Sequence, residues 1–75
     1  MNTKEATQFS IRLKELRIEN NLTQGQLAKL LFVDQTTVSD WETRGKEPSY
    51  ITLVKLVKIL NTTADYLLGI TDYEG

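Results

Sequence analysis

Residues 23–42 of the chain read TQGQLAKLLFVDQTTVSDWE, and this stretch decides the fold. Its apolar side chains recur at helical spacings: Leu27, Ala28, Leu31, Val38 and Trp41. The spacing predicts two amphipathic helices, one beginning after Thr23 and the other after Asp34. Only about three residues separate the two helices, so they must cross at a steep angle, as in a helix-turn-helix unit.

The starts of these two helices carry residues typical of helix caps. Thr23 and Gln26 have the spacing of a capping box, in which each side chain bonds the backbone N–H of the other residue. Asp34 is expected to cap the second helix, which should run to about Thr43. Ala28 is small enough for the helices to approach closely where they cross. Capping explains these residues whatever the protein does.

Helical patterns also flank the motif, and no alternating strand pattern of useful length occurs. Three further helices are expected, with approximate bounds 7–20, 49–60 and 64–68. Gly45 and Pro48 break the chain before the second of these, Ser49 and Thr63 act as N-caps, and Gly69 ends the last helix. The sequence therefore predicts an all-α, compact five-helix domain over residues 1–69, with a loosely held tail at 70–75.

Composition limits what such a domain can do. The chain has 75 residues with no cysteine and no histidine, which removes disulfides, the usual zinc ligands and the usual general base. It has no phosphate-binding glycine loop, so we expect no enzymatic activity, no cofactor and no small-molecule ligand. The start lacks a signal-peptide core, and residues 51–60 are too short to span a bilayer. A cytoplasmic location is the default expectation.

Net charge alone does not indicate a nucleic-acid partner. The whole chain carries −1, and residues 1–60 contain nine bases and seven acids, a net of +2. Residues 23–47 contain three bases and four acids. Because DNA-binding domains are usually much more basic, a DNA-binding function has to be argued from the motif.

The outer face of the helix expected at 34–43 is polar. Four short side chains share it: Gln35, Thr36, Ser39 and Asp40. Such groups can reach the edges of DNA bases, but an ordinary solvated helix face carries the same residue types. The residues by themselves favour the solvated face.

A family resemblance reverses that preference. It rests on four segments in order: LTQGQLAKLL at 22–31, VDQTTVSDWE at 33–42, GKEPS at 45–49 and TADYLLG at 63–69. Through them, residues 9–69 resemble the lambda-repressor-like, or Cro/C1-type (Xre), helix-turn-helix regulators of bacteria and phages. The resemblance implies a lambda-repressor-like fold and a transcriptional regulator, most simply a repressor, that binds specific double-stranded DNA.

The resemblance also implies roles for individual residues. The helix at 34–43 becomes a recognition helix in the major groove, with base contacts from Gln35, Thr36, Ser39 and Asp40. Phosphate contacts are expected from five residues around it: Thr23, Gln24, Thr43, Arg44 and Lys46. Arg17 and Glu42 match an ion pair that joins the first helix to the third and orients the recognition helix.

Two positions depart from the family pattern. Phe32 stands where the turn usually has glycine, and Arg44 stands where glycine often follows the third helix, with Gly45 one place later. A positive φ at Phe32 would cost about 1 kcal/mol or more. We therefore expect either a differently shaped turn or burial of the Phe32 ring. At Arg44 a slight extension of the helix is expected.

Oligomerisation follows from the resemblance as well, because relatives commonly dimerise through the last helix and its flanks. The expected homodimer interface is Tyr66, Leu67 and Ile70. Two recognition helices about 34 Å apart would then read an inverted repeat. Three isoleucines also lie off the expected core faces: Ile11, Ile18 and Ile51.

A competing hypothesis keeps the fold and changes the partner. In it, the domain is a protein-interaction module whose DNA binding is weakened, and the near-neutral charge of residues 23–47 supports this alternative. An uninterrupted negative potential over residues 35–40 would favour the interaction module.

Overall fold

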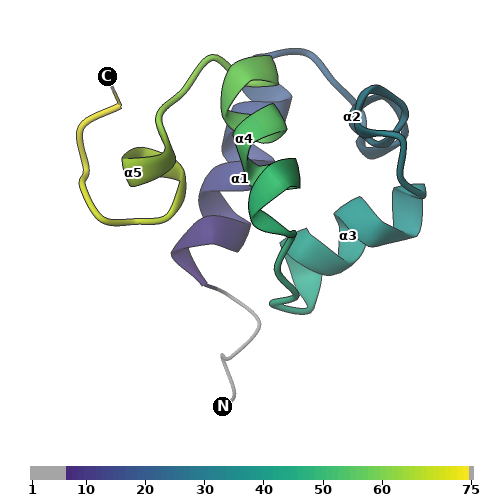
Figure 1. Ribbon diagram of the computed structural model, residues 1–75, viewed down its shortest axis with the longest axis horizontal. Helices are drawn as coiled ribbons and strands as arrows, with labels where there is room; N and C mark the ends of the chain where they lie inside the picture. Colours follow the sequence, from purple (N-terminus) through teal and green to yellow (C-terminus); the bar gives the residue numbers. More distant parts are fainter. Residues whose placement is uncertain (1–6, 75) are drawn as a thin grey trace.

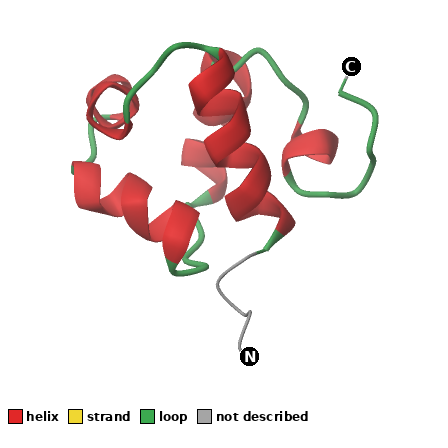
Figure 2. Ribbon diagram, turned by 180° about the vertical axis from the view of Figure 1, so that it is seen from behind, coloured by secondary structure: helices red, strands yellow, loops and turns green. Residues whose placement is uncertain are grey.

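The part of the chain that the computed structural model describes, residues 7–74, consists of helices and loops without a strand (Figures 1 and 2). The helices are α1 Gln8–Glu19, α2 Gln24–Leu31, α3 Gln35–Thr43, α4 Tyr50–Ile59 and α5 Ala64–Leu67. The predicted all-α architecture of five helices is confirmed. Within the described residues, no helix is both long and apolar enough to pass through a membrane.

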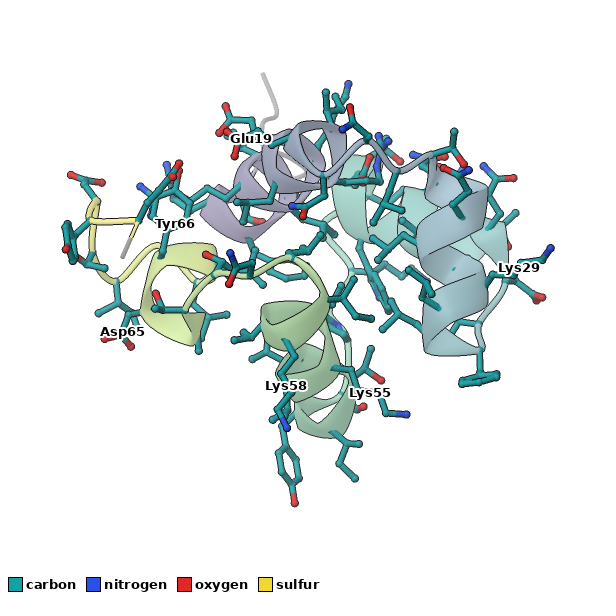
Figure 3. All side chains as sticks on the ribbon, turned by 90° about the horizontal axis from the view of Figure 1, so that it is seen from above. Glu19, Lys29, Lys55, Lys58, Asp65 and Tyr66 are labelled. Carbon is teal, nitrogen blue, oxygen red and sulfur yellow. The ribbon has the colours of Figure 1, made fainter. Side chains whose placement is uncertain are left out.

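The helices enclose one small core. Helix α3 packs against α2 and α1, while α5 contacts both α1 and α4. Viewed from above, α1 and α4 lie on opposite sides of the molecule (Figure 3). The buried hydrophobic residues are Phe9, Leu13, Leu16, Leu27, Ala28, Leu31, Val38, Trp41, Leu56, Leu60, Tyr66 and Leu67. Val33, Leu53 and Val57 are partly buried and pack against this core.

Three of the four N-caps that the sequence predicts are formed. The hydroxyl oxygens of Thr23, Ser49 and Thr63 each accept a hydrogen bond from the backbone N–H three residues later, and Thr7, which was not predicted as a cap, does the same for α1. Asp34 occupies the N-cap position of α3, but its side chain accepts no such bond, so the expected Asp34 cap is wrong. The Asp34 carboxylate is exposed and still lies close to the positive end of the helix dipole.

A buried hydroxyl joins α1 to α3. Ser10, which is 1% exposed, donates a hydrogen bond of 2.6 Å to the backbone carbonyl of Trp41. A carbonyl in the last turn of a helix has no helical partner, so this bond satisfies a group that would otherwise be costly to bury. The bond fixes the distance between α1 and the C-terminal end of α3.

The segment after α5 is held more firmly than the expected loose tail. The Arg12 guanidinium donates to the carbonyl oxygens of Tyr66, at 2.7 Å, and Thr71, at 2.5 Å. It also pairs with Asp72 at 2.7 Å and lies over the Tyr66 ring, 4.2 Å from its centroid. The expectation of a loose tail is therefore wrong up to Asp72, because Arg12 in α1 anchors this segment.

The turn between α2 and α3 is strained at Phe32. Its φ and ψ are 59° and 42°, in the left-handed region that disfavours large side chains. Asn21 and Asn61 adopt the same region after α1 and α4, where asparagine tolerates it. The Phe32 ring is 89% exposed. Both expectations for Phe32 are thus wrong: the turn keeps the shape that suits glycine, and burial does not offset the strain.

Replacing Phe32 with glycine is expected to stabilise the domain by about 1 kcal/mol, because glycine adopts the left-handed region without a Cβ penalty. Urea unfolding followed by Trp41 fluorescence measures the change. Phe32→Ala is the matched control, since it removes the exposed ring and retains the Cβ. If alanine stabilised as much as glycine, the gain would come from removing the ring and not from relieving backbone strain.

Candidate nucleic-acid interface

The outer face of α3 carries the side chains nominated for base contacts. They are Gln35, Thr36, Ser39 and Asp40, of which the first two are exposed and the last two are half-buried. Val38 and Trp41 project into the core on the opposite side of the helix. The helix is thereby anchored through one face, and the other face presents amide, hydroxyl and carboxylate groups to solvent.

A chain of hydrogen bonds runs from the interior to this face. The Arg17 Nε donates to Glu42 Oε2 at 2.7 Å, and the Gln24 Nε2 donates to Glu42 Oε1 at 3.1 Å. Gln24 in turn accepts from the Gln35 Nε2 at 2.8 Å. Three helices are linked in this way, because Arg17 belongs to α1, Gln24 to α2, and Glu42 and Gln35 to α3.

This chain of bonds sets the orientation of both glutamine amides. The Glu42 carboxylate only accepts hydrogen bonds, so it must face the NH2 group of Gln24. The Gln24 oxygen is then directed at Gln35, and Gln35 must offer its own NH2 group in return. Among the described residues, 7–74, Gln35 finds no partner for its oxygen or for its second N–H. A side chain with one free acceptor and one free donor can bind a partner through two hydrogen bonds.

The Arg17–Glu42 ion pair that the resemblance implies is formed, and it is buried. The side chains are 10% and 1% exposed, and the pair is bidentate, with a second contact of 3.1 Å from Arg17 to Glu42. Arg17 also donates to the carbonyl of Leu22 at 2.8 Å, which ties down the loop before α2. A buried charge is costly unless it is paired and fully hydrogen-bonded, and this carboxylate meets that condition.

Arg44 and Asp40 form a solvent-facing ion pair on the candidate interface. Their closest atoms are 3.4 Å apart, and the side chains are 73% and 37% exposed. Arg44 has φ −115°, so α3 ends without a left-handed residue there and Gly45 takes that conformation at 69°. The helix is not extended, since it ends at Thr43. This exposed contact contributes little to stability and leaves the Arg44 guanidinium accessible.

The other candidates for phosphate contact lie around the two ends of the motif. The Thr23 hydroxyl oxygen caps α2, while Thr43 donates to the carbonyl of Ser39 at 2.8 Å. Lys46 is exposed in the loop after α3. Both hydroxyls therefore have local roles. Among the described residues of this set, the cations available to a phosphate are Lys46 and the exposed Arg44, which also contacts Asp40.

The residues nominated for dimerisation divide into buried and exposed ones. Leu67 is fully buried in the core of its own chain, so its place in the expected interface is wrong. Tyr66 is 9% exposed, and burial raises the pKa of its hydroxyl, with the negative charge of Glu74 adding to the rise. Ile70 is 70% exposed and Tyr73 is 74% exposed. The apolar surface at this end of the molecule is thus carried by Ile70 and Tyr73.

Two residues that join distant parts of the fold were not found from the sequence. Ser10 looks like an ordinary polar helix residue, and its position on the same face as Leu13 was the only sign of burial. Arg12 belongs to no recognisable sequence motif. Its contacts with Tyr66 and Thr71 join segments that are far apart in the sequence, so no local pattern points to them.

Comparison with known proteins matches residues 13–67 to the helix-turn-helix family. The HTH-type transcriptional activator BcrR of Enterococcus faecalis is 39% identical over 62 residues, covering 83% of this chain and 30% of BcrR. The HTH-type transcriptional regulator ImmR of Bacillus subtilis (strain 168) is 38% identical over 58 residues, covering 77% of this chain and 46% of ImmR. The uncharacterized HTH-type transcriptional regulator YobD of the same organism is 34% identical over 61 residues, covering 81% of this chain and 54% of YobD. The chain thus spans about half the length of these relatives or less.

Replacing Arg17 with methionine is expected to destabilise the domain by about 3 kcal/mol, because the buried Glu42 carboxylate would lose its cationic partner. Replacing Glu42 with methionine in the same chain should recover much of that loss, since no buried charge then remains. Urea unfolding of the two single variants and the double variant measures the coupling. Additive losses would contradict the view that Arg17 and Glu42 act as one unit.

Proposed function

Because the chain belongs to the Cro/C1-type (Xre) helix-turn-helix family, we propose that it is a sequence-specific transcriptional regulator, a repressor that binds double-stranded DNA as a homodimer. The observation that carries the proposal is the free edge of Gln35, which is exposed on α3 and held by Gln24. A side chain fixed in this way loses little further entropy when it meets a base.

Base recognition is assigned to the N-terminal half of α3, lying in the major groove. The free oxygen and N–H of Gln35 match the N6 amino group and N7 of adenine, a bidentate contact worth about 1–3 kcal/mol of discrimination. Thr36 offers a methyl group to a thymine methyl, and Ser39 offers a hydroxyl to either kind of edge. Asp40 accepts a hydrogen bond from a cytosine amino group. Its carboxylate then either binds that group and Arg44 together or releases Arg44.

Phosphate binding is assigned to groups that flank α3. Arg44 and Lys46 supply positive charge beyond its C-terminal end, with Thr43 beside them. Thr23 and Gln24 lie at the start of α2, an eight-residue helix whose first backbone N–H groups and dipole favour an anion. These contacts position α3 without reading sequence.

The homodimer is assigned to the C-terminal end of the described chain, with the exposed Ile70 and Tyr73 and the mostly buried Tyr66 as its residues. Support comes from the high exposure of both apolar side chains and from the anchoring of this segment by Arg12. A dimer covering its operator excludes other proteins from that DNA, which is the physical basis for repression. BcrR is named as an activator, so a promoter fusion in cells is the assay for the direction of regulation.

Selection from a random duplex library at two salt concentrations tests the proposal directly. We expect an inverted repeat whose half-sites are about one helical turn apart, because a two-fold dimer presents two copies of α3. Affinity should fall as salt rises, since phosphate contacts release counterions. Recovery of no motif, with only weak binding that disappears at moderate salt, would reject the proposal in favour of a protein-interaction module.

Two alanine variants separate base reading from phosphate binding. Gln35→Ala should relax the preference at one base position of each half-site, because that contact alone carries sequence information. Lys46→Ala should weaken binding to every sequence similarly. It should also reduce the slope of log K against log salt concentration by about one for each phosphate contact that is lost. Gel-shift titrations against the selected operator and single-base variants provide the readout. A uniform loss for Gln35→Ala on all sequences would rule out its role in base recognition.

A further inference from the structure

The exposed face of α4 has an unusual composition for a solvated surface. Its N-terminal half carries Tyr50, Ile51 and Val54, which are 78%, 57% and 46% exposed. Its C-terminal half carries Lys55 and Lys58, both exposed, and the helix contains no acidic residue. Figure 3 shows the two lysines extending from α4 away from the core. We call this set the α4 face.

The exposed face of α1 also combines apolar and charged side chains, but its charges are negative where those of the α4 face are positive. Ile11 and Ile18 are 42% and 55% exposed, and Glu15 and Glu19 are exposed beside them. We call these four residues the α1 face; Lys14 borders it on the far side from the two acids. Within residues 7–74, neither glutamate and neither lysine of the α4 face takes part in an ion pair.

The spacing along the two helices permits a matched register. With the helices parallel and Ile11 opposite Ile51, Glu15 falls opposite Lys55 and Glu19 falls near Lys58. The two acids are separated by roughly 6 Å of helix rise and the two lysines by roughly 4.5 Å, a difference that long side chains absorb. In this register Ile11 meets Ile51, Ile18 falls opposite the aliphatic stem of Lys58, and each acid has a base within reach of its side chain.

The two faces cannot meet within one chain. Glu19 lies at one edge of the molecule in Figure 3, and Lys55 and Lys58 lie at the opposite edge with the core between them. We propose that the α1 face of one copy of this chain binds the α4 face of a second copy, with Glu15 and Glu19 paired to Lys55 and Lys58. Such a contact joins different surfaces, so it extends from copy to copy instead of closing as a two-fold dimer.

The size of the contact makes it weak in free solution. The apolar groups of the α4 face expose on the order of 300 Å², below the roughly 800 Å² per partner of a stable interface. Copies bound at neighbouring DNA sites would meet at a high effective concentration, so the contact would make their binding cooperative. This consequence rests on the proposed function, whereas the contact between copies does not.

Charge reversal in the 75-residue chain tests the contact without DNA. We expect Glu15→Lys with Glu19→Lys, and separately Lys55→Glu with Lys58→Glu, to weaken self-association at low salt by about tenfold, since attraction becomes repulsion at two pairs. An equal mixture of the two double variants should associate again, because a basic α1 face then meets an acidic α4 face. Sedimentation equilibrium from micromolar to millimolar protein, at 50 and 500 mM salt, measures association and its screening.

Two controls show whether a loss of self-association comes from the two proposed faces. Lys29→Glu reverses a charge on α2, and this side chain points away from both faces in Figure 3, so it should leave self-association unchanged. Circular dichroism checks that every variant is folded. The proposal is overturned if the unmodified chain shows no salt-sensitive association at millimolar concentration, or if the mixture associates no better than either double variant. A dimer through Ile70 would persist in all these variants, so its presence is distinguishable from the proposed contact.

Discussion

The buried ion pair between Arg17 and Glu42 is the constraint on which the rest of the molecule depends. Glu42 sits in the last turn of α3 with its side chain 1% exposed, where an unpaired carboxylate would strongly destabilise the fold. Arg17 satisfies it from α1, and Gln24 satisfies it from α2. One buried charge therefore requires three helices to be in place together, and it also fixes the amide of Gln35 at the surface. Stability and the geometry of the candidate interface share one network.

The sequence predicted the elements of this structure better than their contacts. All five helices were predicted from the helical spacing of apolar residues and from capping residues, because both signals lie within each helix and its ends. Burial at the ends of the chain was less predictable: Leu67 was assigned to a dimer surface and is fully buried, since a four-residue helix gives too little periodicity to define its inner face. Arg12 was missed because its partners, Thr71 and Asp72, are some sixty residues distant, and no local pattern encodes such a contact.

Phe32 shows that an unfavourable local conformational free energy does not by itself predict a change in the shape of a turn. An expected strain of about 1 kcal/mol suggested that the turn would change shape or bury the ring, and neither occurs. The turn between α2 and α3 keeps this residue in the left-handed conformation although its side chain is that of phenylalanine. The network through Gln24 and Glu42 holds the two helices in that crossing. A penalty of this size is small beside the free energy of a buried core, so the domain tolerates it.

The near-neutral charge of the domain has consequences for how it would recognise DNA. Arg44 and Lys46 are the exposed cations that follow α3, and Arg44 already contacts Asp40. Few phosphate contacts mean a shallow dependence of affinity on salt and weak nonspecific binding. A larger share of the binding free energy must then come from base contacts such as that of Gln35, and a single domain offers few of these. Useful affinity would therefore require several domains on one DNA, so contacts between copies become as important as contacts with the bases.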